Sequence, residues 1–163
     1  MAKKIGQRTL KATTTAKIDG KLQPQAIELE QAVLGALMID NESLSNAIDS
    51  LQMEYFYKTE HQKIFEAIVT LFNNTQPVDI LTVSEELKRM EELKFIGGLA
   101  YISELTNNVA SSSNTEFHAR IIAEKFIKRS LISISNNIIG DAFNDSVDIF
   151  DLLNTAEEKY LRN

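Results

Sequence analysis

Two histidines and three adjacent pairs of glutamates are the side chains of this 163-residue sequence best suited to acid–base or metal chemistry. His61 and His118 each fall in the first turn of a predicted helix, where we expect them near the surface. Two histidines are too few for a metal site unless carboxylates join them. Paired glutamates diverge on a helix and are expected to face water; the pairs are Glu85-Glu86, Glu91-Glu92 and Glu157-Glu158. This set of residues therefore predicts no catalysis.

The motifs of nucleophilic catalysis and of phosphate binding are also absent from the sequence. With no cysteine, thiolate metal sites, thiol nucleophiles and disulfides are excluded. Gly20-Lys21 is followed by Leu22 and has no glycine five residues before it, so it is not a P-loop. Gly97-Gly98 indicates a turn rather than a phosphate cradle, because no predicted strand precedes it. Neither G-x-S-x-G nor H-E-x-x-H nor E-x-x-H occurs, so we expect no catalytic residue, metal or cofactor in this chain.

The formal net charge of −6 divides into two unequal parts. Residues 1–22 hold six basic residues and one acidic residue, a balance of +5, and the rest of the chain balances to −11. Because residues 1–22 lack aromatics and any apolar period, we predict a disordered basic tail. The tail could contact nucleic-acid phosphates, although a solvated tail without a fixed partner is the commoner explanation. A local patch of Lys125, Lys128 and Arg129 could also contact phosphates, although an ion pair or a hydrophilic rim of the helix is the commoner explanation. No apolar run approaches the roughly 20 residues that span a bilayer, so we expect no membrane contact and a cytoplasmic protein.

Capping signals and apolar periodicity divide residues 23–110 into helices. Pro24 suits the first turn of a helix, and Asn41 can cap the next one. Three capping boxes predict further helix starts, at Thr59–Gln62, Thr82–Glu85 and Ser113–Glu116. Asp79 is an alternative start for the second of these helices. Since no strand alternation of useful length is present, we predict an all-α fold in which residues 23–110 form a globular helical head.

A long helix follows the head. From Asn114 to about Asn144 there is no proline and a single glycine, which predicts a helix about 45 Å long. Its apolar residues do not fit one stripe, so the helix must be covered from two sides. A last helix after Asp148 would cover one side as an antiparallel hairpin over residues 111–163, and a second copy of the hairpin would cover the other. The candidates for this self-association are Phe117, Ile121, Ile127, Leu131, Ile134, Ile138, Leu152 and Leu153.

Five blocks of residues between positions 24 and 161 stand in a characteristic order. They are Pro24 to Gly35 followed by Leu37 to Asn41; Phe56-Tyr57 with His61, Ile64 and Phe65; Pro77-Val78-Asp79 with Thr82-Val83 and Leu87; Gly97-Gly98 with Tyr101 and Leu105; and Arg129 with Leu131-Ile132. Glu157 in the last predicted helix fits the same series. The series resembles the amino-terminal part of bacterial replicative helicases of the DnaB type.

The resemblance implies a globular head and a helical hairpin that pairs with the hairpin of a neighbour. In that family, three such dimers form a collar over a ring of ATPase domains, the collar contributes to primase binding, and the ring unwinds DNA at the replication fork. It thus implies three partners, namely a second copy, primase, and single-stranded DNA held by the full ring. ATP and Mg²⁺ would belong to the missing ATPase domain, so we expect part of a longer protein that is not catalytic alone. The alternative is a stand-alone helical adaptor or a weak nucleic-acid-binding module that uses the basic tail.

Overall fold

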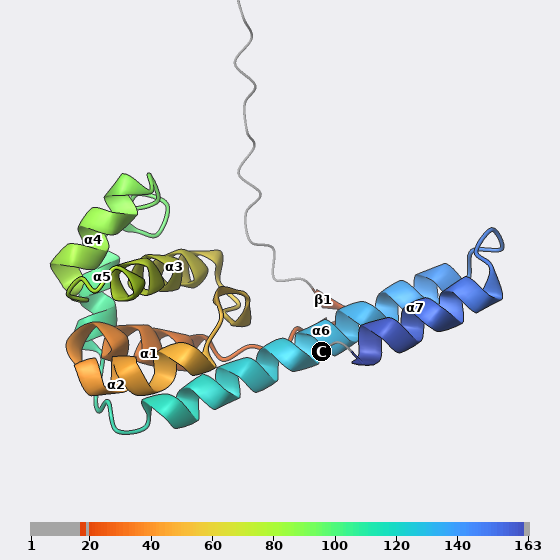
Figure 1. The fold of residues 1–163 in the computed structure, drawn as a ribbon, viewed down its shortest axis with the longest axis horizontal. Coiled ribbons are helices and arrows are strands. Elements are labelled where there is room, and N and C mark those ends of the chain that lie inside the picture. Colours follow the sequence, from red (N-terminus) through yellow and green to blue (C-terminus); the bar gives the residue numbers. More distant parts are fainter. Residues whose placement is uncertain (1–16, 19, 162–163) are drawn as a thin grey trace, which may run out of the picture.

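The computed structural model describes residues 17–18 and 20–161, and the structural statements below refer to these residues. The α-helices are α1 (Ile27–Ile39), α2 (Asn41–Ala47), α3 (Thr59–Asn73), α4 (Ile80–Arg89), α5 (Gly98–Asn107), α6 (Thr115–Ala142) and α7 (Ile149–Leu161). Two short 3₁₀ helices, η1 (Ile48–Ser50) and η2 (Met53–Tyr55), lie between α2 and α3. Figure 1 shows a head made of α1 to α5, from which α6 extends and along which α7 folds back. The predicted all-α fold, a helical head followed by a long antiparallel hairpin, is confirmed.

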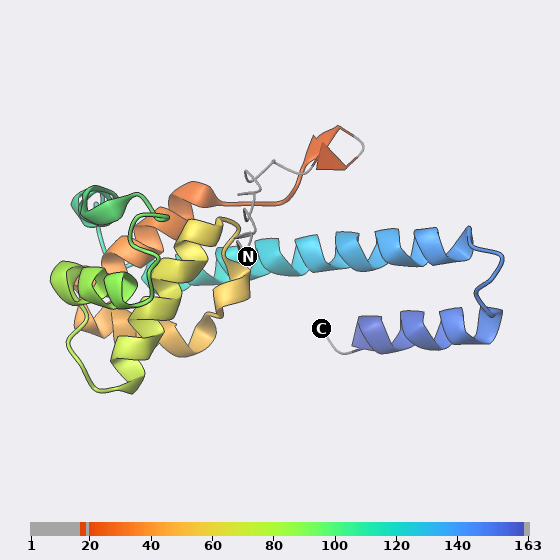
Figure 2. The ribbon, with the colours of Figure 1, turned by 90° about the horizontal axis from the view of Figure 1, so that it is seen from above.

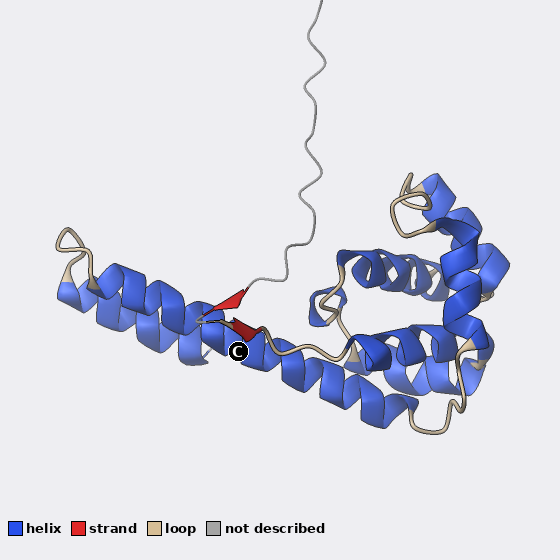
Figure 3. Ribbon diagram, turned by 180° about the vertical axis from the view of Figure 1, so that it is seen from behind, coloured by secondary structure: helices blue, strands red, loops and turns tan. Residues whose placement is uncertain are grey.

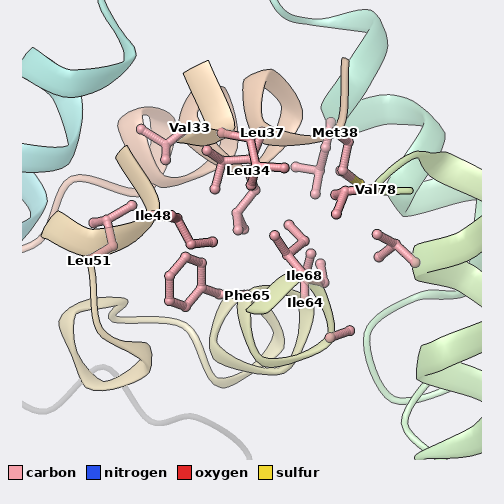
Figure 4. Packing of buried hydrophobic residues seen from close by; sticks show 14 of the residues in the cluster. Val33, Leu34, Leu37, Met38, Ile48, Leu51, Ile64, Phe65, Ile68 and Val78 are labelled. Carbon is pink, nitrogen blue, oxygen red and sulfur yellow. The ribbon is translucent and has the colours of Figure 1, made fainter. Parts of the chain in front are cut away.

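The core of the head is built around α1, which packs against α2, α3, α5 and the first half of α6. Val33, Leu34 and Leu37 recur at helical spacing and are fully buried. Figure 4 shows Phe65 and Ile68 of α3 on the opposite side of the same cluster. Because burying one large aliphatic or aromatic side chain is worth about 1.5–3 kcal/mol, this cluster is the main source of the head's stability.

The close approach of α1 to α5 depends on a glycine. A Cβ atom at Gly35 would lie 2.2 Å from the carbonyl oxygen of Leu105 and 2.6 Å from Cγ2 of Val109. Any other residue would push the two helices apart, so this position requires glycine. At the other end of α5, Gly97 and Gly98 have φ angles of +103° and +74°, and this left-handed backbone turns the chain into the helix.

The starts of α2 and α4 differ in part from the predicted caps. Asp40, rather than Asn41, caps α2, because its carboxylate accepts a hydrogen bond from the Glu42 backbone N–H. Asp79 caps α4 and forms a capping box with Thr82. The alternative start at Asp79 is therefore confirmed, and the predicted box of Thr82 with Glu85 is wrong. A carboxylate that precedes the helix is the stronger acceptor for the free N–H groups of its first turn.

The other predicted caps also need correction, apart from Asp148. Helix α3 begins at Thr59 itself, and the Gln62 side chain donates to the carbonyl of Phe56 instead of closing a box. Helix α6 begins after Asn114 without a side-chain cap, so the Ser113 box does not form. Pro24 lies three residues ahead of α1 and outside its first turn. Asp148 does cap α7, since its carboxylate accepts the backbone N–H groups of residues 150 and 151.

Residues 17–22, predicted as the end of a disordered tail, contain two short strands. β1 (Lys17–Ile18) pairs antiparallel with β2 (Lys21–Leu22), so that part of the tail prediction is wrong. Backbone pairing needs no apolar period, which is why the composition argument missed it; the Asp-Gly pair at 19–20 is the sequence signal for such a hairpin. In Figure 3 the strands overlap α6, and Figure 2 shows that they are set off to one side of it. The rest of the predicted tail, residues 1–16, lies outside the described residues.

Candidate self-association surface

Helix α6 has two environments along its 28 residues. In its first half, Thr115, Ala119 and Ile122 are buried where the helix packs on the head. From residue 130 to its end, no residue of α6 is buried, although α7 packs along it. Figure 2 shows α6 and α7 running side by side away from the head, with the turn between them at the far end. The second half of the hairpin, which is α6 from residue 130 onward together with α7, therefore presents surface that the head does not cover.

The structure divides the eight predicted self-association residues into two groups. Phe117, Ile127, Leu131 and Leu153 are exposed. Ile121, Ile134, Ile138 and Leu152 are half-buried, because packing within the chain already covers part of each side chain. Ile127 and Leu131 lie one helical turn apart on α6 and are 49% and 39% exposed, so together they form an apolar strip in the middle of the helix. Their role in association stays a prediction.

Four further exposed apolar residues flank the turn of the hairpin and were not among the candidates. They are Ile139, Phe143, Ile149 and Phe150. Phe143 and Phe150 are 86% and 71% exposed, the highest values among the large apolar residues described. The signal was present in the sequence, since Ile139 and Phe143 are spaced i, i+4 on one helix and Ile149 and Leu153 on the other. Exposed apolar residues at this density indicate a surface that meets another protein.

The second half of the hairpin is acidic overall, and Lys159 is the one basic residue in the sequence of residues 130–161. Residues 130–158 contain no lysine or arginine and six carboxylates, which are Asp141, Asp145, Asp148, Asp151, Glu157 and Glu158. An acidic surface repels the phosphates of nucleic acids. This part of the molecule is therefore suited to a protein partner.

A groove of about 370 Å³ lies between the β1–β2 hairpin and the uncovered half of α6. Leu22 of β2 lines one side, and Leu131 and Ile132 of α6 line the other. The strands thus form one edge of the apolar strip on α6. A partner that covers Leu131 would meet this edge as well.

The predicted basic patch of Lys125, Lys128 and Arg129 is not a continuous surface. Lys128 is exposed and Lys125 is half-buried, but the guanidinium of Arg129 turns inward and donates hydrogen bonds to the carbonyls of Pro24 and Tyr55. Arg129 is therefore unavailable to phosphates, and the patch prediction is wrong for this residue. Its place on α6, two turns beyond the buried Ile122, puts Arg129 on the side of the helix that faces the head.

His61 is fully buried, and its predicted position near the surface is wrong. Its Nδ1 lies 2.6 Å from a carboxylate oxygen of Glu30 in α1, and its Nε2 lies 2.7 Å from the hydroxyl of Tyr101 in α5. Glu30 is also buried and accepts the backbone N–H of Tyr57 at 2.7 Å. A protonated Nδ1 that donates to Glu30 leaves Nε2 to accept the Tyr101 hydroxyl proton, so each group finds a partner.

Glu30, His61 and Tyr101 resemble a catalytic arrangement, but Glu30 and His61 are closed off from solvent and Tyr101 is half-buried. His61 and Glu30 have 0% and 1% of their surface exposed, and no third carboxylate or histidine joins them. Across the described residues, no group of three or more histidines and carboxylates is placed to hold a metal ion. The trio therefore ties three helices together. His118 is half-buried beside the ring of Phe117 on α6.

The segment that leads into α6 is held by Asp40 and its neighbours. Hydroxyl groups of Ser112 and Ser43 hold the pKa of the Asp40 carboxyl below its usual value by hydrogen bonding. The Ser43 hydroxyl lies 2.8 Å from Asp40 and 3.1 Å from the carbonyl of Ser112. The start of α2 and the loop before α6 are therefore linked through one polar cluster.

Comparison with known proteins agrees with this architecture. A family model described as DnaB-like helicase N terminal domain matches residues 22–124, which is more than half of the chain. The chain belongs to this family. The DnaB match begins at the second strand and includes the whole head together with the first part of α6.

Several replicative helicases are similar to the chain over most of its length. The replicative DNA helicase DnaB of Rhodothermus marinus is 48% identical over 143 residues, covering 88% of this chain and 15% of the relative. DnaB of Treponema pallidum is 41% identical over 145 residues, covering 89% of this chain and 33% of the relative. The chain thus spans a third or less of the length of these relatives, at the part that corresponds to a DnaB N-terminal domain.

Two solved structures share the fold. The crystal structure of the N-terminal domain of DnaB helicase from Mycobacterium tuberculosis has a TM-score of 0.80 and 27% identity, and the match covers 86% of this chain and 99% of that one. The structure of a DnaB-like replicative helicase and its interactions with primase has a TM-score of 0.70 and 28% identity, covering 84% of this chain and 31% of that one. The chain is therefore a DnaB-type N-terminal domain in fold as well as in sequence.

Proposed function

We propose that this DnaB-type domain assembles a hexameric replicative helicase and helps to recruit primase at the replication fork. Two chains pair through their hairpins, and three such dimers form a collar over the ATPase ring of the full-length protein. The domain itself carries out no catalysis. ATP and Mg²⁺ belong to the separate ATPase domain, and single-stranded DNA is held by the complete ring.

The observation that supports the assembly role is the exposed apolar surface on the part of the hairpin that extends from the head. Ile127 and Leu131 are exposed in the middle of α6, and Leu153 and Phe150 are exposed on α7. Burying such a surface supplies about 25 cal/mol per Å², offset by the loss of translational and side-chain freedom. A second copy presents the same surface, so an isologous contact can cover both at once.

The primase role is supported by likeness to a solved DnaB-like helicase described together with its interactions with primase. The alternative function, a weak nucleic-acid-binding module that uses the basic tail, is less favoured. The second half of the hairpin is acidic, and Arg129 is engaged inside the molecule.

Light scattering of the chain over a range of concentrations tests the assembly role. We expect a dimer at high concentration, and we expect Ile127→Asp or Leu131→Asp to shift the equilibrium to monomer, because each places a charge in the apolar strip. Ile138→Asp is less informative, since Ile138 is half-buried within the hairpin.

Ser133→Asp is the matched control, because it adds the same charge at an exposed polar position of α6. It should leave the dimer intact. Unaltered dimers in both strip variants, or a strictly monomeric parent chain, would contradict the proposed assembly surface. Circular dichroism of each variant checks that the helices remain folded.

A further inference from the structure

Arg129 stands at the point where α6 leaves the head. Ile122 is the last buried residue of α6, and Arg129, two turns further along, still donates hydrogen bonds to the head. The direction of the hairpin relative to the head is therefore decided near this residue. Long helices are rarely straight and curve over their length.

The guanidinium of Arg129 joins two head segments that are far apart in the sequence. Its Nη1 donates to the carbonyl of Pro24 at 2.8 Å, and its Nη2 donates to the carbonyl of Tyr55 at 2.7 Å. Pro24 precedes α1, and Tyr55 ends η2. A planar guanidinium with two nitrogens engaged fixes direction as well as distance, which a single contact cannot do.

Aromatic rings enclose the same guanidinium. The ring of Tyr57 has its centroid 5.3 Å from the guanidinium carbon, and the ring of Phe126, one turn earlier on α6, lies at 5.8 Å. The rings of Tyr55 and Phe126 lie 4.9 Å apart. Both cation–π distances are within the range at which the ring face attracts the positive charge.

The charge of Arg129 is balanced by a carboxylate that three helices hold in place. Burial lowers the pKa of the guanidinium, and the nearby negative charge of Glu30 acts in the opposite direction. Glu30 is itself fixed by His61 of α3, and His61 by Tyr101 of α5. Arg129 of α6 is thus coupled electrostatically to a carboxylate that is held inside the head.

We propose that Arg129 is the positioning residue that fixes the hairpin relative to the head. Its two carbonyl contacts, its aromatic neighbours and Glu30 hold α6 at its exit from the head, so that head and hairpin behave as one rigid body. Removing the guanidinium frees this joint while the core of the head stays packed. This role rests on the proposed assembly function, because a fixed direction is what lets paired hairpins place their heads in a ring.

The absence of native cysteine allows a direct test in the full chain. Spin labels on Asn73→Cys in the head and Asp145→Cys at the turn of the hairpin report one intramolecular distance, and dilution with unlabelled chain removes signals between copies. Both positions are exposed. In the parent we expect a narrow distance distribution. In Arg129→Met, which keeps an apolar stem without donors, we expect it to be at least about twofold broader, as for a domain freed at a hinge.

Lys128→Met is the control, because it removes a neighbouring exposed positive charge. It should keep the narrow distribution. Arg129→Lys should fall between the parent and Arg129→Met, because an ammonium keeps the charge opposite Glu30 but lacks the planar fork. The melting temperature of the head separates loss of position from loss of fold.

An unchanged distribution in Arg129→Met overturns the positioning role, and so does equal broadening in Lys128→Met. If Arg129→Met does not fold, Arg129→Lys decides alone: a distribution as narrow as in the parent overturns the role, and a broader one supports it. The distance is measured within one chain. A failure of dimer formation would therefore contradict the proposed function without changing this result.

Discussion

Buried polar residues distinguish this head from a purely apolar helix bundle. The fully buried Glu30 and His61 and the half-buried Tyr101 come from three helices and satisfy one another's hydrogen bonds. A buried carboxylate that loses its partner carries most of its desolvation cost without compensation. The trio is therefore sensitive to any single truncation.

His61→Leu tests this sensitivity. The leucine leaves the Glu30 carboxylate with backbone donors only and leaves the Tyr101 hydroxyl without its acceptor. We expect the free energy of unfolding to fall by about 2–4 kcal/mol. Urea denaturation at a concentration where the chain is monomeric measures it. His118→Leu, which changes the other histidine, should stay within about 0.5 kcal/mol of the parent, and a similar small loss for His61→Leu would contradict the account.

The burial of His61 was open to prediction from the sequence but was not predicted. His61, Ile64, Phe65 and Ile68 follow i, i+3, i+4, i+7, which places the histidine on the apolar face of α3. Glu30 stands in the same relation to Val33 and its successors in α1. Two polar residues on apolar helix faces that pack together, here Glu30 and His61, indicate a buried hydrogen-bonded pair. Which partner each takes depends on the packing of helices, and Tyr101, 40 residues later, could not be assigned from spacing.

At the scale of elements, the helix bodies followed the apolar period closely, while their starts depended on local competition between acceptors. The long helix was expected from 114 to about 144 and runs over Thr115–Ala142. Three Ser/Thr-based capping boxes were expected, yet Asp79 caps α4 in place of the Thr82 box, and α3 and α6 begin without a side-chain cap. Asp40 and Asp148 cap α2 and α7. Each of these carboxylates lies ahead of the first turn. The sequence pattern of a capping box does not show which of several nearby acceptors will bind the free N–H groups of the first turn.

Asp79→Ala measures the contribution of one cap. The carboxylate of Asp79 accepts the backbone N–H groups of Leu81 and Thr82 at 2.8 and 2.9 Å, and both donors lose this partner in the variant. We expect a loss of about 1 kcal/mol in the free energy of unfolding. Glu85→Ala on the exposed side of α4 is the control and should cost less than about 0.5 kcal/mol, because its ion pair with Lys88 is solvent-exposed. Equal losses in the two variants would argue against the cap.

The whole molecule combines a packed head with a hairpin that is only half covered. The sequence led to this division correctly, because the apolar residues of α6 outnumber what one face can hold. It could not show that Arg129 turns inward, since its partners Pro24 and Tyr55 are 105 and 74 residues away. No helix in the described part of the chain has the length and apolar character needed to cross a membrane.

Primase binding is the prediction that belongs to the whole molecule. Titrating the primase of the same organism into the chain, followed by calorimetry, should show saturable binding if the domain recruits primase. The same titration with Leu131→Asp shows whether the paired hairpins are needed, because this variant is expected to be monomeric. If neither the parent chain nor Leu131→Asp gives heat or a complex with primase, the recruitment role is contradicted. The assembly role is tested separately by light scattering.

The packing of α1 against α6 sets the order in which the chain can mature during synthesis. Helix α1 is completed at residue 39, but its contacts with α6 and the link from Pro24 to Arg129 await residues made far later. At translation rates of about 5–20 residues per second, roughly 5–20 s separate the two events. In that time α2, α3 and α5 can already pack on Val33, Leu34 and Leu37, but the side of α1 that meets α6 stays without its partner. The head is therefore completed only when the first half of α6 and Arg129 have been made.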